Sequence, residues 1–302
     1  MSLTLSNALL RAPLAACCLA QDTRAAGPTA ATTQGAAGSA PSTWMIGLAA
    51  VGAVVLVIYV TRRLVYPAKL HLTQASGRRS RLHPIHAVAL YLFYVLAQAV
   101  AIKLLGAWLP AKSDELLTLA AVISQTLWLA AALLVAWMAF DMGLVRGMGL
   151  SMRHWFFDAI RGVVAYLAVL PVCLGLTRLT QLLIPGEEHR MLRALHQVGA
   201  GWQALIIVSA VVLAPLAEEV FFRGLLQSTF RKYLRRPWAA ILLTSAFFAL
   251  VHAAYPTSMP AMFALSVALG YNYERCGRLP APILIHALFN GVFIIETLRA
   301  AG

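Results

Sequence analysis

Long apolar stretches alternate with short polar connections along most of this sequence. A helix needs about 20 apolar residues to cross the hydrocarbon core of a bilayer, so each stretch predicts a membrane-embedded helix. The sixth and seventh stretches are short, and we expect other helices rather than lipid to surround part of them. The eight predicted spans are residues 44–60, 84–108, 116–140, 157–184, 201–226, 238–253, 260–273 and 281–298.

Composition agrees with this pattern. Of the 302 residues, 61% are hydrophobic and 12% are charged, whereas soluble domains average about 45–50% apolar and about 25% charged residues. We therefore predict an all-α, polytopic membrane protein of about eight transmembrane helices, with membrane lipid as its surroundings. The net charge of +13 lies largely in short loops. It indicates membrane topology, and no nucleic-acid partner is expected.

The basic loops predict the orientation. Fourteen Lys and Arg residues fall on one side, in loops 62–83, 141–156, 231–236 and 274–279, and six fall on the other side. Cytoplasmic loops carry the excess of Lys and Arg, so the first side is predicted to be cytoplasmic and both termini to lie opposite. A multi-pass protein of a bacterial plasma or inner membrane is the expected localisation.

The chain divides into three regions. Residues 1–43, rich in Ala, Thr, Gly and Ser, predict a mobile tail or a weak signal region, with Ala12–Ala20 as a short candidate signal core. Residues 44–197 supply the amino-terminal transmembrane helices and carry no recognisable motif. Residues 198–302 hold the polar side chains that suggest chemistry.

An acidic cluster interrupts the fifth apolar stretch. Between Trp202 and Ala217 only two side chains are polar, and then Glu218, Glu219 and Arg223 follow. Each charge near the bilayer centre costs about 2.5–3.5 kcal/mol on insertion scales, so an unused cluster is unexpected. In a regular helix Glu219 and Arg223 pair at i and i+4, while Glu218 lies about 100° away.

Pro215, just before the acids, should remove one backbone donor, free the carbonyl of Val211 and kink the helix. The plain alternative for the whole cluster is a buried ion pair that only locks two helices together.

Two later stretches carry histidines. Phe248 and His252 are separated by one helical turn, and so are His286 and Asn290. A buried carboxylate can act as a general base on water, a histidine can orient that water, and Asn or His can donate to an oxyanion. Glu218, His252 and His286 could alternatively hold Zn²⁺, although the helical HExxH signature is absent.

In this order on successive apolar helices, EExxxR (Glu218, Glu219, Arg223), FxxxH (Phe248, His252) and HxxxN (His286, Asn290) resemble the CAAX protease and bacteriocin-processing family of intramembrane endopeptidases. The resemblance covers about residues 200–300. It implies an all-helical protease with an intramembrane active site. In that scheme Glu218 is the base, His252 assists it, and His286 and Asn290 stabilise the oxyanion. Glu219 and Arg223 are structural, with Phe248 as support.

Several alternatives remain open. A metal-free mechanism with no cofactor is favoured over Zn²⁺, because Asn290 is a poor zinc ligand and a good oxyanion donor. The resemblance implies a protein or peptide substrate, and lipidated CAAX proteins are the eukaryotic substrates of the family. A non-proteolytic membrane scaffold or immunity factor of the same fold is the second hypothesis, and an ion-coupled transporter is the third. With a straight fifth helix, Glu218 and His252 are expected to differ in depth by about 10 Å.

Overall fold

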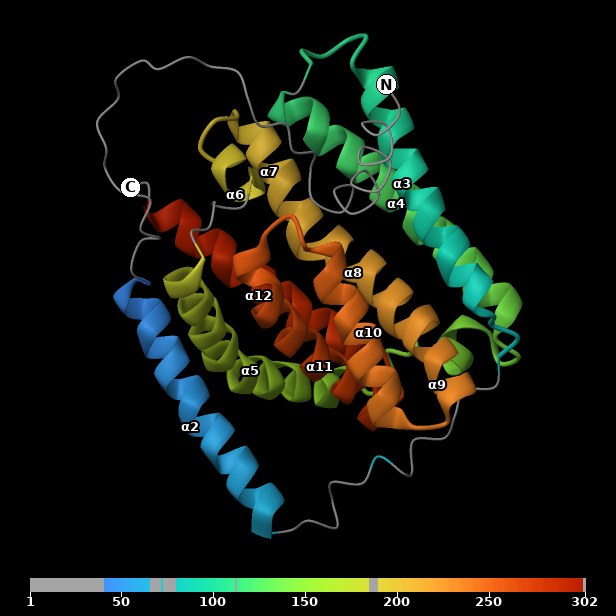
Figure 1. Ribbon diagram of the computed structural model, residues 1–302, viewed down its shortest axis with the longest axis vertical. Coiled ribbons are helices and arrows are strands. Elements are labelled where there is room, and N and C mark those ends of the chain that lie inside the picture. The colour runs from blue at the N-terminus through green and yellow to red at the C-terminus, as the bar shows by residue number, and fades with distance from the viewer. Residues whose placement is uncertain (1–40, 66–71, 73–79, 112, 185–189, 301–302) are drawn as a thin grey trace, which may run out of the picture.

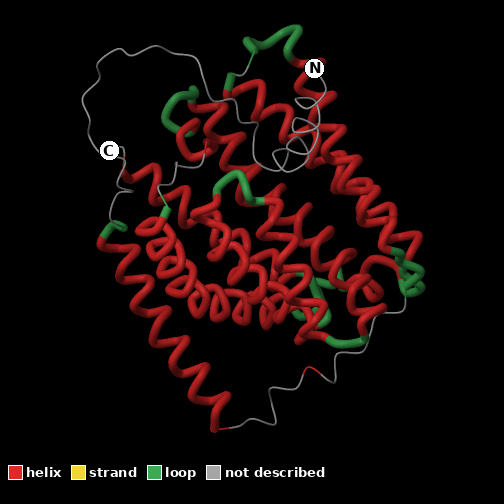
Figure 2. Tube along the Cα trace, in the orientation of Figure 1, coloured by secondary structure: helices red, strands yellow, loops and turns green. Residues whose placement is uncertain are grey.

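The protein is a bundle of helices (Figure 2). The computed structural model describes residues 41–65, 72, 80–111, 113–184 and 190–300. In these residues the sole β-type pairing is an isolated bridge between Ser80 and Phe140. The predicted tail at 1–43 and its candidate signal core lie outside the described residues, apart from the last three positions of the tail.

Helices occupy all eight predicted spans. They are α2 (Thr43–Val65), α3 (Pro84–Leu105), α4 (Asp114–Ala139), α5 (Trp155–Leu183), α6 (Arg190–Ala194), α7 (Ala200–Val208), α8 (Ala214–Glu219), α9 (Ser228–Leu234), α10 (Pro237–Val251), α11 (Met259–Cys276) and α12 (Pro280–Ala300). Helices α7, α8 and α9 are joined by π-helical segments, Ser209–Leu213 and Val220–Gln227, into one continuous 35-residue helix.

Within the described chain, six helices are long and apolar enough to cross a membrane: α2, α3, α4, α5, the continuous helix and α12. Helix α10, with 15 residues, is shorter, and α11 lies against α5, α10 and α12. Of the two spans expected to be short, α10 is short but exposes large apolar side chains such as Leu242 and Phe247. Helix α11 is longer than predicted, at 18 residues, and packs against three other helices. The fold is all-α and polytopic, as predicted.

Local sequence explains where several helices begin and end. Helix α4 starts at a serine cap, because Ser113 Oγ accepts a hydrogen bond from the Leu116 backbone N–H at 3.2 Å. Helix α11 ends at Gly277, whose φ of 68° is left-handed. Gly149 has a φ of 94°, and a Cβ there would lie 2.3 Å from the Gly277 carbonyl oxygen. Only glycine allows these two loops to approach so closely.

The helices that carry the motifs occupy the centre of the bundle (Figure 1). Helices α3 and α4 flank them on one side, and α2 and α5 flank them on the other. Aromatic rings link α3 and α4 to the centre. Trp128 of α4 lies 4.7 Å from Tyr94 of α3 and 4.8 Å from Phe221 of the continuous helix, measured between ring centroids. The amino-terminal helices are thus part of the same core as the motif helices.

The basic loops meet at one end of this bundle. Lys232 Nζ donates to the Leu82 carbonyl at 2.9 Å, and Arg231 pairs with Glu274 at 3.7 Å. The Leu279 N–H donates to the Gly149 carbonyl at 2.9 Å. At the opposite end, Ser42 before α2 hydrogen-bonds Glu296 of α12 through its N–H and its hydroxyl, at 2.7 and 2.6 Å. The grouping of loops used to predict the orientation agrees with these contacts.

Candidate active site

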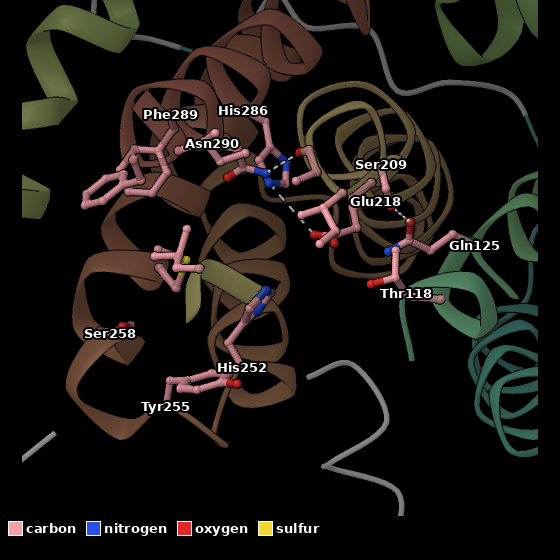
Figure 3. Close-up of a pocket in the computed structure, with 18 of the residues that line it drawn as sticks. Thr118, Gln125, Ser209, Glu218, His252, Tyr255, Ser258, His286, Phe289 and Asn290 are labelled. Atoms are coloured by element: carbon pink, nitrogen blue, oxygen red, sulfur yellow. Dashed lines mark hydrogen bonds and ion pairs between the residues drawn. The ribbon is translucent and has the colours of Figure 1, made fainter. Parts of the chain in front are cut away.

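A cavity of about 240 Å³ lies between the motif helices and the amino-terminal helices α3 and α4. Glu218, His252, His286 and Asn290 all line it, which brings the four predicted catalytic residues together (Figure 3). His252 follows the last residue of the short α10. Glu218 and His252 therefore line the same cavity, in spite of the difference in depth that was expected between them.

The continuous helix is irregular just before the acids. The Ala214 N–H bonds to the Ser209 carbonyl, five residues back, as in a π-helix. At this spacing Pro215, which has no N–H, would face the carbonyl of Ala210. Asn290 Nδ2 donates to that carbonyl at 2.8 Å. The carbonyl that lacks a backbone donor because of Pro215 is therefore that of Ala210, and Asn290 supplies the donor instead. The sequence had predicted the carbonyl of Val211, one residue later, because it assumed a regular α-helix.

Glu219 and Arg223 form the predicted buried pair. Both side chains have no exposed surface, and Arg223 Nη1 lies 2.9 Å from Glu219 Oε1. Arg223 Nη2 also donates to the hydroxyl and carbonyl oxygens of Ser266 on α11, at 2.7 and 3.2 Å. The guanidinium carbon lies 5.0 Å from the ring centroid of Phe248, close enough for a cation–π contact. Arg223 therefore joins the continuous helix to α10 and α11.

Glu219 has a second partner that the sequence did not indicate. His286 Nδ1 lies 2.9 Å from Glu219 Oε1. A carboxylate only accepts hydrogen bonds, so Nδ1 carries the hydrogen, and in the neutral form of the ring Nε2 is then an acceptor. Nε2 lies 4.0 Å from Glu218 Oε2. Glu219 thus fixes the orientation of a histidine that faces Glu218.

Glu218 faces the cavity with one oxygen unsatisfied. Its side chain is 13% exposed, and among the described residues no group hydrogen-bonds its buried Oε2. The 4.0 Å to His286 Nε2 is too long for a direct hydrogen bond and suits a bridging water. Glu218 thus lines the cavity and carries a buried carboxylate oxygen that has no hydrogen-bond donor within the described chain.

His252 is held by its own helix. Its Nδ1 lies 2.7 Å from the Phe248 carbonyl oxygen, which again leaves Nε2 as the free acceptor. The Phe248 ring lies 4.7 Å from the His252 ring and 5.8 Å, edge-on, from the His286 ring. Phe248 therefore packs between the two histidines, consistent with the supporting part expected for it. In the described chain no hydrogen bond or ion pair joins His252 to Glu218; the histidine nearest to that carboxylate is His286.

A metal ligand set requires at least three donors. Among the described residues no group of three His, Cys, Asp or Glu side chains is placed to hold a metal ion. Glu218 and His286 converge, and His252 does not join them. The three residues considered for Zn²⁺ therefore do not fit a metal site in this arrangement.

Polar residues of α4 complete the cavity wall, and the sequence did not single them out. Thr118 and Gln125 line the cavity, and Ser209 Oγ donates to Gln125 Oε1 at 3.1 Å (Figure 3). Thr118 and Gln125 are seven residues apart and lie on one stripe of α4. This spacing was a usable signal. However, Ser124, Gln125 and Thr126 are consecutive polar residues on different faces, so periodicity did not show which one faces the site.

Comparison with known proteins finds likeness in the motif region. Residues 200–292 match the family model described as Rce1-like, type II CAAX prenyl endopeptidase Rce1-like. The chain is 32% identical over 85 residues to an uncharacterized 24.3 kDa protein of Escherichia coli, covering 27% of this chain and 39% of that protein. It is 34% identical over 88 residues to the UPF0177 protein YaiF of Lactococcus lactis subsp. lactis (strain IL1403), covering 29% and 38%.

The chain thus spans about two fifths of the length of these relatives. No solved structure matches. The resemblance stated from the three motifs is confirmed for the segment that carries them.

Proposed function

Because residues 200–292 match a family of CAAX prenyl endopeptidases, we propose that this multi-pass membrane protein is an intramembrane endopeptidase that hydrolyses a peptide bond with water activated by Glu218. One observation carries the proposal. The Oε2 atom of Glu218 is without a hydrogen-bond partner in the described chain, at the wall of a cavity and 4.0 Å from the free Nε2 of His286.

The distance between these two acceptors suits a shared water. If a water oxygen lies about 2.8 Å from each acceptor, the angle acceptor–water–acceptor is about 90°, which is close to the angle between the two O–H bonds of water. Both hydrogens are then directed at Glu218 and His286, and an oxygen lone pair is directed at the cavity. Glu218 takes the proton as the oxygen attacks the peptide carbonyl. His286 is thereby proposed to orient the water, the part that the motifs had suggested for His252.

The remaining groups serve the later steps. The second N–H of Asn290 Nδ2, beyond the one donated to Ala210, is proposed to stabilise the oxyanion as the tetrahedral intermediate forms. Collapse of the intermediate breaks the C–N bond, and the leaving amine takes the proton first removed from water. The protonated Glu218 is proposed to return that proton to the leaving amine, and His252, whose Nδ1 is held by the Phe248 carbonyl, is proposed to assist from the cavity wall.

The substrate is proposed to be a protein or peptide that reaches the cavity from the membrane. Farnesylated CAAX peptides and unmodified apolar peptides are the classes to compare, and a bacterial plasma or inner membrane is the proposed location. A Zn²⁺ mechanism and a non-proteolytic scaffold are the alternatives that the test separates.

The test uses the full chain in liposomes and a library of internally quenched peptides, farnesylated and unmodified. Glu218→Gln should lower turnover by about 10²–10⁴-fold, the typical value of a general base, with unchanged thermal melting. Glu115→Gln, in the first turn of α4 and outside the cavity, is the matched control and should retain activity. Full turnover by Glu218→Gln would overturn the assignment of Glu218 as the base, whereas no cleavage of any library peptide by the unaltered protein would favour the scaffold hypothesis. Loss of activity with 1,10-phenanthroline and its return with zinc would establish the metal mechanism instead.

A further inference from the structure

We propose that Gln125 of α4 is a substrate-binding residue, which donates a hydrogen bond from its side-chain amide to a main-chain carbonyl of the bound peptide. This inference rests on the proposed function. It assigns a part in substrate recognition to the amino-terminal helices, which carry none of the three motifs.

The orientation of Gln125 is set from the neighbouring helix. Ser209 Oγ lies 3.1 Å from Gln125 Oε1 and donates to it. With the oxygen held there, the NH₂ group is the end that remains for the cavity, and Figure 3 shows this nitrogen on the side away from Ser209. Within the described chain no acceptor is hydrogen-bonded to it.

The π-helical segment is what brings Ser209 to this cavity. In a regular α-helix, Ser209 and Glu218 are nine residues apart and lie about 180° from each other around the axis. One residue inserted by the π-helical segment Ser209–Leu213 reduces that separation to about 80°. Both side chains then line the same cavity. This π-helical turn places Ser209, which hydrogen-bonds Gln125, on the same cavity as Glu218. Such irregularities within helices are frequent at functional sites.

The chemistry of the wall identifies the ligand atom. An amide NH₂ group donates and does not accept, so its partner must be an acceptor. Met262, Phe289 and Phe293 also line the cavity, and this apolar part of its wall suits side chains of an apolar substrate. The acceptors that every peptide brings into an apolar site are its main-chain carbonyls, which need a donor when they leave water.

The experiment measures KM and kcat separately, in liposomes, for the library peptide that the unaltered protein cleaves best. Gln125→Leu removes the donor, and Gln125→Glu keeps the acceptor for Ser209 while removing the donor. Both should raise KM by about 3- to 15-fold and leave kcat unchanged, because a bond made equally in the ground and transition states affects binding alone. Ser209→Ala should raise KM by less than the two Gln125 variants do. Ser209→Thr, which keeps the hydroxyl, should have the KM of the unaltered protein.

Thr126→Val is the matched control. Thr126 is the next residue on α4, and its hydroxyl donates to its own helix, at the Val122 carbonyl, at 2.7 Å. The variant should keep the KM of the unaltered protein. Thermal melting of every variant shows that the fold is retained.

A second measurement identifies the carbonyl. The same peptide is made with one amide at a time replaced by an ester, which weakens the preceding carbonyl as an acceptor. One ester should raise KM for the unaltered protein and have no further effect with Gln125→Leu, because two changes to one hydrogen bond are not additive.

The outcomes separate the two proposals. If either Gln125→Leu or Gln125→Glu has the KM of the unaltered protein, the assignment of Gln125 is overturned, and the proposed function is not affected. A fall in kcat of about 100-fold at constant KM places the amide at the reacting carbonyl and also overturns it. If no library peptide is cleaved or bound by the unaltered protein, the proposed function fails, and this inference fails with it.

Discussion

Arg223 should contribute more to the stability of the fold than any other charged residue near the cavity. Its guanidinium is fully buried, pairs with Glu219 at 2.9 Å, donates twice to Ser266 and lies 5.0 Å from the Phe248 ring centroid. Arg223→Met fills similar space but leaves the Glu219 carboxylate buried with His286 as its remaining partner. Removing one member of a buried pair costs about 3–5 kcal/mol, because the other charge is left uncompensated.

At about 2–4 °C per kcal/mol, this loss lowers the melting temperature by about 6–20 °C. The assay is thermal melting of the full chain in detergent, followed by the amount of monodisperse protein. Glu218→Gln is the matched comparison, since its carboxylate is partly exposed and makes no hydrogen bond within the described chain through Oε2. Its melting temperature should equal that of the unaltered protein.

A double-variant cycle isolates the pair. Glu219→Gln with Arg223→Met should cost less than the sum of the two single changes, because neither charge is then left alone. Equal melting of Arg223→Met and Glu218→Gln would refute the division between a structural pair and a free carboxylate.

The remaining predictions concern the oxyanion donor and the orientation. Asn290→Ala should lower kcat by about 10²–10³-fold in the peptide assay, with a small loss of stability because the Ala210 carbonyl loses its donor; an unchanged kcat would remove Asn290 from the oxyanion site. Cysteines introduced at Ser80 and Gly302 should be labelled by an impermeant maleimide from opposite sides of the membrane, with Ser80 on the cytoplasmic side, as the basic loops predict; labelling of both from one side would contradict the eight-span arrangement.

The sequence by itself determined the helices and the identity of the motif residues. Long apolar stretches are a local property of the sequence, and each of the eight became a helix. The i, i+4 spacing of Glu219 and Arg223 likewise predicted the buried pair, because a helix turn places such side chains together.

Tertiary structure decided which partners these residues have. A 3.6-residue period fixes the faces of a helix only while the helix is regular, and the π-helical segment Ser209–Leu213 rotates the residues after it by about 100°. This is why the freed carbonyl is that of Ala210 and why Ser209 reaches the same cavity as Glu218. No local rule could show it from the sequence.

Contacts between helices were also beyond the sequence. That Glu219 holds His286, and that Gln125 rather than Ser124 or Thr126 faces the cavity, depends on how α12 and α4 pack against the continuous helix. Helix packing is set by the fit of many side chains from distant parts of the chain. The sequence identified the chemical groups, and the packing of the bundle determined which of them face one another.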